Sequence, residues 1–211
     1  MDNICHTLAG AALAESGLKR RTALGTATLI IGANFPDIDA IAIPLGHSLA
    51  WRRGVTHGVL ALVVLPLALT ALVLAWDRLV RRRARSGAKE AVRPRQILFL
   101  AMLAVLTHPV LDWMNTYGMR WLMPFDGRWF YGDALFIIDP WLWIALGAGV
   151  VAARARQRRG TTRPYRPARW ALAFAGAYIA LMVVSSGVGE RVVRGRLTTA
   201  GVAPGAEIIM T

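Results

Sequence analysis

Residues 58–76 read GVLALVVLPLALTALVLAW, a run of 19 positions without a charged side chain. At ~1.5 Å per residue, a helix of this length nearly crosses the ~30 Å hydrocarbon core of a bilayer. Residues 170–189, WALAFAGAYIALMVVSSGVG, form a second uncharged run. The runs 97–113 and 134–153 are equally apolar, apart from one or two ionisable residues near one end. These four runs predict transmembrane helices.

The overall composition supports this interpretation. Of the 211 residues 55% are hydrophobic and 18% charged, whereas an average soluble domain is roughly 25% charged. So much apolar surface excludes an intrinsically disordered chain. Cys5 is the only cysteine, which excludes a disulfide framework. The formal net charge of +13 is compatible with nucleic acid, with anionic lipid, or with signals that orient a membrane protein.

The positions of the basic residues favour the last of these explanations. Residues 19–21, 77–95 and 154–169 contain 18 of the 25 Lys and Arg, and the apolar runs lie between them. The positive-inside rule assigns such loops to the cytoplasm. Residues 114–133, rich in Trp and Tyr, then lie on the outer side. We therefore expect contact with membrane lipids and no nucleic-acid partner.

These observations predict an all-α, polytopic membrane protein with about four full spans. The short run 4–16 and the run 23–43, which contains acidic residues, add one or two partly inserted N-terminal helices. We treat residues 1–211 as a single membrane-embedded domain. Within it, 1–145 carries the polar motifs, and 146–211 supplies a basic loop, the final span and an outer C-terminal tail.

Most of the membrane-proximal histidines and carboxylates fall at the same end of their runs in this topology. Ionisable groups at membrane depth are costly and usually functional. Scatter over several depths would be expected without a shared site. The residues at this shared level are His6, Asp37, Asp39, His57, His108, Asp112, Asp133 and Asp139.

The spacing of these residues suits a metal ion. His108 and Asp112 are four residues apart, so they share one face of a helix. Pro36, in F-P-D-I-D, ends or kinks the preceding helix and directs carboxylates inward. Mixed His and Asp ligands suit zinc, manganese or iron. An open site of this kind would polarise a substrate oxygen and lower the pKa of a bound water.

Four segments together resemble a known family. They are DNICHTLAG (2–10), NFPDID (34–39), RRGVTHG (52–58) and THPVLDWMNTYG (107–118). They are similar to the YdjM-like membrane-bound, metal-dependent hydrolases of bacterial inner membranes, over about residues 1–145. The resemblance implies a multi-pass protein of the bacterial inner (cytoplasmic) membrane.

The order of these motifs is also similar to the zinc-dependent phospholipase C and single-strand nuclease group. That similarity implies that Asp37, His57, His108 and Asp112 hold one divalent ion, zinc in the first instance. Asp112 would bridge to a second ion held with His6. The chain lacks the later His and H-x-x-x-E ligands of that group. We therefore expect one or two ions and not three, unless Asp133 or Asp139 substitutes.

Other polar residues have two interpretations each. Asp39 or Asp133 is the candidate general base of a hydrolytic reaction; Asp39 is also a candidate cap for the following segment. Asp139 either supports the metal ligands or caps a helix. Arg52 and Arg53 either grip a substrate phosphate or contact lipid headgroups and orient the chain.

The expected function is metal-dependent hydrolysis of a phosphoester in a lipid or lipid-linked substrate, at the outer face of the membrane. The alternative is a membrane transporter or metal-handling protein in which the same histidines and carboxylates form an ion site. A transporter needs polar residues at several depths, whereas here they lie at one. That difference favours an interfacial enzyme.

Overall fold

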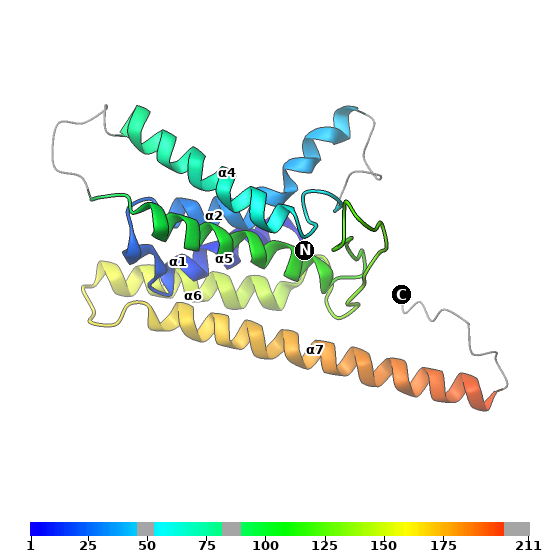
Figure 1. The fold of residues 1–211 in the computed structure, drawn as a ribbon. Helices are drawn as coiled ribbons and strands as arrows, with labels where there is room; N and C mark the ends of the chain where they lie inside the picture. The colour runs from blue at the N-terminus through cyan, green and yellow to red at the C-terminus, as the bar shows by residue number, and fades with distance from the viewer. Residues whose placement is uncertain (46–52, 82–89, 201–211) are drawn as a thin grey trace.

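The computed structural model describes residues 1–45, 53–81 and 90–200, and this part of the chain is helical with two isolated β-bridges and no strand. The six α-helices are α1 (Asn3–Glu15), α2 (Gly25–Asn34), α4 (Ala61–Trp76), α5 (Pro94–Trp113), α6 (Pro140–Arg158) and α7 (Arg166–Thr199) (Figure 1). Three shorter turns of helix accompany them: η1 (Leu18–Arg21), η2 (Phe35–Leu45) and the π-helical η3 (Asp77–Arg81). The predicted all-α class is confirmed.

The two N-terminal helices are short, as expected. The Asp2 carboxylate caps α1 by accepting hydrogen bonds from the backbone N–H groups of Ile4 and Cys5. α2 ends at Asn34, two residues before Pro36, and the chain continues as the 3-10 helix η2. Proline cannot donate the next helical hydrogen bond, which explains this change. The break carries Asp37 and Asp39 away from the axis of α2.

Three helical segments in the described part of the chain are long and apolar enough to cross a membrane: Ala61–Arg81, Pro94–Trp113 and Arg166–Thr199. The first of them exposes large apolar side chains; Val63 is 60% and Leu72 is 58% exposed. Such exposure is unfavourable in water and is expected where lipid covers a helix. The structure is thus consistent with a helical membrane protein, and the predicted number of spans stays a prediction.

The helix predicted over the apolar run 134–153 begins later than the sequence suggested. α6 starts at Pro140, because the Asp139 carboxylate accepts hydrogen bonds from the backbone N–H groups of Trp141 and Leu142. Residues 134–139 are not helical. The hydroxyl of Tyr178 on α7 also donates to Asp139, at 2.9 Å. Asp139 is therefore a helix cap, the second of the two roles that the sequence allowed.

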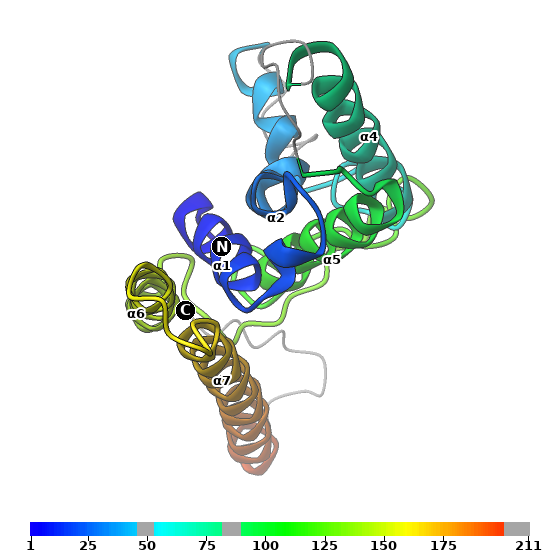
Figure 2. The ribbon, with the colours of Figure 1, turned by 90° about the vertical axis from the view of Figure 1, so that its left-hand side faces the viewer.

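The helices pack side by side with their axes roughly aligned. α2 lies between α1 and α5, α4 packs on α5, and α6 and α7 cover the other side of α1 (Figure 2). A close approach at Gly10 sets the distance between α1 and α2. A Cβ atom at this position would lie 2.6 Å from the carbonyl oxygen of Leu29.

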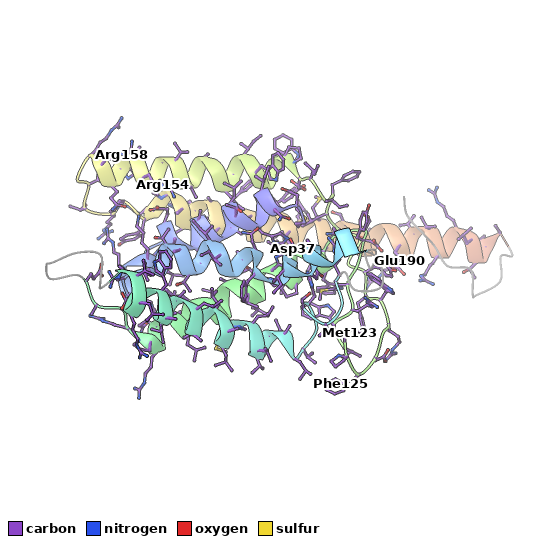
Figure 3. The ribbon with its side chains drawn as sticks, turned by 90° about the horizontal axis from the view of Figure 1, so that it is seen from above. Asp37, Met123, Phe125, Arg154, Arg158 and Glu190 are labelled. Carbon is purple, nitrogen blue, oxygen red and sulfur yellow. The ribbon has the colours of Figure 1, made fainter. Side chains whose placement is uncertain are left out.

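The three basic segments gather at one end of the molecule. Lys19 donates to the Gln157 side chain at 2.7 Å, and Arg21 donates to the Gln96 side chain at 3.3 Å. Figure 3 shows Arg154 near this end and Met123 at the opposite end. The structure therefore places the predicted cytoplasmic segments together and the 114–139 loop opposite to them.

Candidate metal centre

Four buried or nearly buried side chains meet near the 114–139 end. One ligand atom from each lies within 4.8 Å of all the others. His57 and His108 are fully buried, and Asp112 is 1% exposed. The four residues are Asp37, His57, His108 and Asp112, the set that the resemblance to the phospholipase C group implies for one ion.

The separations between these atoms fit a small cation. The Nε2 atoms of His57 and His108 are 3.2 Å apart, and each lies 3.6 Å from Oδ2 of Asp112. Oδ1 of Asp37 lies 3.5 Å from Nε2 of His108 and 3.9 Å from Nε2 of His57. Ligands bound tetrahedrally to zinc at about 2.0–2.1 Å are about 3.4 Å from one another. The observed set is close to that spacing.

The four ligands come from three different segments of the chain. His108 and Asp112 lie one turn apart near the end of α5. Asp37 belongs to the first turn of η2, after the break at Pro36. His57 lies in the turn before α4, where its backbone N–H donates to the carbonyl oxygen of Gly54 at 3.0 Å. The site therefore depends on α2, α4 and α5 packing together.

A hydrogen bond determines which ring nitrogen of the neutral His108 carries the proton. Its Nδ1 lies 2.7 Å from the carbonyl oxygen of Ala33. A carbonyl oxygen only accepts, so Nδ1 carries the proton and Nε2 of the neutral ring presents a lone pair. That lone pair points toward His57 and the two carboxylates. A backbone carbonyl in this position is a common support for a metal-binding histidine.

The same reasoning applies to His57. The Thr56 hydroxyl donates its single proton to Oδ2 of Asp39, at 3.1 Å. Its oxygen then accepts from Nδ1 of His57, at 2.9 Å. Two lone pairs, one on each Nε2, consequently face each other across 3.2 Å. With both rings neutral, this contact needs a proton or a metal ion between the two Nε2 atoms. The carboxylates of Asp37 and Asp112 lie beside the same point, so the residues present fit a metal ion.

Asp112 presents its two oxygens to different partners. Oδ2 faces His57 and His108, whereas Oδ1 lies 3.2 Å from Nε2 of His6 and also accepts from the Met1 amino group. His6 stacks on His108, with ring centroids 3.8 Å apart. The Nδ1 atom of His6 is buried without a hydrogen-bond partner. Oδ1 of Asp112 thus faces His6 and Met1, away from the four-ligand cluster.

The Arg53 side chain contacts the cluster at Asp112 and also the chain that follows α5. Its Nε lies 3.2 Å from Oδ2 of Asp112, and Nη1 donates to the Asn115 side chain and to the carbonyl oxygen of Gly118. The Tyr117 ring lies below the guanidinium, at 5.4 Å. In the part of the chain that the structure describes, Nη2 has no hydrogen-bond partner. Arg53 thus has two N–H donors left for a ligand.

The other candidates lie elsewhere. Asp39 supports Thr56 and receives the backbone N–H of Arg53 at 3.0 Å. Asp133 contacts α7, where the Ser186 hydroxyl donates to the Asp133 carbonyl oxygen. Partial desolvation, together with the Glu190 carboxylate, raises the pKa of Asp133 above its ordinary value. Neither carboxylate belongs to the four-ligand cluster, and their proposed role as a general base stays a prediction.

Arg52 and His6 are the remaining predicted site residues. Arg52 lies outside the described residues, so its proposed phosphate contact stays a prediction. His6 is brought to the cluster through Asp112, although it is not one of the four ligands. The prediction that His6 and Asp112 share a second ion is compatible with this contact.

Supporting residues were missed in the sequence. Thr56 directly precedes His57, and Asn115 follows Asp112 by three positions. Both lie within the motifs, but they are uncharged and were not predicted as site residues. The Asn115 side-chain oxygen accepts from Arg53 and from the backbone N–H of Tyr117. Their spacing from the ligands was the available signal.

Comparison with known proteins extends the sequence resemblance. The model of the YdjM inner membrane protein family matches residues 1–188, which covers every helix of the cluster and reaches into α7. Neither a search of curated proteins nor a search of solved structures found a match to this chain. Because the matched region includes most of the sequence, the chain belongs to the YdjM inner membrane protein family.

Proposed function

We propose that this protein is a metal-dependent hydrolase that cleaves a phosphoester of a lipid or lipid-linked substrate at the outer face of the inner membrane. One observation carries the proposal: the Nε2 atoms of two histidines and the oxygens of two carboxylates converge on a volume suited to one ion. A divalent ion bound there supplies Lewis acidity toward a phosphoryl oxygen and an activated water.

The protein's own side chains have separable roles in this proposal. Asp37, His57, His108 and Asp112 hold the ion, and His6 shares Oδ1 of Asp112 with any second cation. Around them, Thr56 and Asp39 hold the Nδ1–H group of His57, which turns Nε2 of this ring toward the ion. Arg53 directs Nη2 to an anionic group beside Asp112, where a guanidinium binds phosphate well.

The surface next to Asp37 supports a lipid as the substrate. A cavity of about 430 Å³ is lined by polar Asn3 and Asn34 as well as by Asp37 itself. An apolar groove of about 360 Å³ between α2 and α4 adjoins it, because Ile31 and Phe35 line both. A polar head beside Asp37 would then have a place for its apolar chain.

The length of this groove suits an apolar chain. It is lined along α2 from Leu24 to Phe35, a rise of about 16 Å at 1.5 Å per residue. An acyl or isoprenoid chain would fill it, whereas a soluble phosphoester lacks such a chain.

Metal analysis and a substrate screen test the proposal together. Protein purified in detergent should contain about one or two divalent ions per chain. It should hydrolyse phosphomonoester or phosphodiester lipids, lose that activity in a chelator, and regain it with zinc or manganese. Full activity after complete metal removal would contradict the proposal.

Matched variants separate the enzyme from the transporter. His108→Ala should remove both metal and turnover. Asp126→Asn should change neither, because Asp126 is a partly exposed loop residue whose carboxylate accepts from Arg128. Metal-dependent ion flux into proteoliposomes, without turnover of any phospholipid offered, would instead favour the transporter or metal-handling alternative.

A further inference from the structure

A second polar cavity lies at the opposite end of the molecule from the metal cluster. It measures about 360 Å³ and is lined by Arg163, Tyr165, Arg166, Arg169, Trp170 and Ala173. Half of this lining is arginine. From this cavity we propose that the protein binds the phosphate headgroup of an anionic phospholipid at the start of α7.

The charge of this cavity is not neutralised by the protein. Over residues 1–45, 53–81 and 90–200, the ion pairs involve none of its three arginines. The nearby Glu15 already binds Lys19 and Arg154. Three guanidinium groups without a carboxylate repel one another, so an anion between them is favourable.

A hydrogen bond and an aromatic contact hold Arg169 in place beside the cavity. Arg169 donates from Nε to the carbonyl oxygen of Ser16 at 2.9 Å and lies over the Tyr165 ring at 4.3 Å. Arg20 approaches the same ring, at 5.9 Å. These contacts fix one wall of the cavity against the end of α1.

The depth of the cavity matches a lipid headgroup. Arg166 is the first residue of α7, and Trp170 begins the uncharged run 170–189. Tryptophan at such a boundary is typical of the membrane interface. The cavity also lies at the end where the basic segments gather, and basic pockets on the cytoplasmic side commonly bind anionic headgroups.

An apolar groove gives the lipid chain a place beside the head. A groove of about 460 Å³ between α6 and α7 includes Gly149, Ala152 and Phe174 in its lining. Trp170 lines both the groove and the basic cavity. A headgroup among the arginines would thus be continuous with a chain lying between α6 and α7. A free phosphate ion would use only the first of these features.

Native mass spectrometry of the full chain can test this assignment. Protein released from nanodiscs of 80% phosphatidylcholine and 20% phosphatidylglycerol should retain phosphatidylglycerol preferentially. The double variant Arg163→Gln/Arg166→Gln should weaken that binding by at least tenfold, because each Arg near an anionic surface contributes about 1 kcal/mol. Arg163→Lys/Arg166→Lys, which keeps both charges, should retain most of it.

A charge-matched control lies at the far end of the same helix. Arg191→Gln/Arg196→Gln removes two charges outside the cavity and should leave retention of phosphatidylglycerol unchanged. Inorganic phosphate at 10 mM should not displace the lipid. Equal retention by the Arg163/Arg166 glutamine variant and the wild type would overturn the proposal. So would displacement by inorganic phosphate, which would identify the ligand as a free anion.

Discussion

Asp112 connects the two halves of the candidate metal centre, because each of its oxygens faces a different group of partners. Asp112→Asn preserves size but replaces one acceptor oxygen with an N–H donor. We expect the variant to lose most bound metal and at least 100-fold in turnover. Elemental analysis of the purified protein, with an assay on the best lipid substrate, checks this. An uncharged residue is easier to insert than a carboxylate, so membrane insertion should be intact.

The control for this variant is Asp126→Asn in the 114–139 loop, which should keep metal and activity. If Asp112 served only in packing, asparagine would keep a hydrogen bond to His6 and be tolerated. Full metal content in Asp112→Asn would therefore contradict the bridging role.

Thr56 tests how His57 is held. Thr56→Val keeps the shape of the side chain but removes the acceptor for Nδ1 of His57 and the donor to Asp39. Loss of such a supporting hydrogen bond usually weakens metal affinity 10–100-fold. A competition titration with a zinc chelator should show this weakening, with the same number of ions bound at saturation. Thr198→Val, remote on α7, is the matched control. Equal affinities in the wild type and Thr56→Val would exclude this role for the hydroxyl.

The metal-ligating side chains could be predicted from the sequence, whereas the groups that hydrogen-bond to them could not. H-x-x-x-D predicted one helical face, and the structure shows His108 and Asp112 there. By contrast, the carbonyl oxygen of Ala33 that fixes His108 belongs to another helix. A backbone carbonyl has no signature in the sequence, so only the packing of α2 on α5 could reveal it.

At the scale of the helices, the contact between α1 and α2 positions His6. A side chain at Gly10 would meet the Leu29 carbonyl oxygen at 2.6 Å and Cβ of Ala33 at 3.1 Å. Gly10→Val should therefore force the helices apart, and overpacking of this kind costs about 1–3 kcal/mol. We expect a lower Tm in detergent and weaker metal binding. A scan of intrinsic fluorescence against temperature measures the first.

Gly176→Val provides the comparison for this variant. Gly176 also lies within a helix, yet a Cβ there meets nothing within 4 Å. Valine is a better helix former than glycine, so this change should be neutral or slightly stabilising. Equal Tm values for the two valine variants would show that the approach of α1 to α2 is not tight.

The ends of a helix could be predicted from the sequence where a nearby proline or capping side chain determines them. Pro36 correctly marked the break after α2. The start of α6 was wrong by six residues, because hydropathy alone extended the run over 134–139, whereas Asp139 begins the helix as its cap. The packing partners of α7 were not predictable, since its uncharged run 170–189 does not show which face meets α1 or α6.

Over the whole molecule, the two ends differ in chemistry. The basic segments and the arginine cavity lie at one end, and the metal cluster and the aromatic loop lie toward the other (Figures 1 and 3). α7 has 34 residues, about 51 Å at 1.5 Å per residue, which exceeds a ~30 Å core. A helix of this length that spans the membrane projects from it at one end or both.

The orientation of these ends is the last prediction. In a Cys5→Ala background, single cysteines at Gly127 and Arg158 report on the two ends. Gly127 accepts a side chain without contacts, since a Cβ there meets nothing within 4 Å. The positive-inside rule predicts that a membrane-impermeant maleimide labels position 127 in spheroplasts and position 158 only in inverted vesicles. Labelling of both positions from one side would contradict the separation of the two ends across the membrane. The reverse pattern would keep that separation but place the metal centre on the cytoplasmic side, where its substrate would have to come from the inner leaflet.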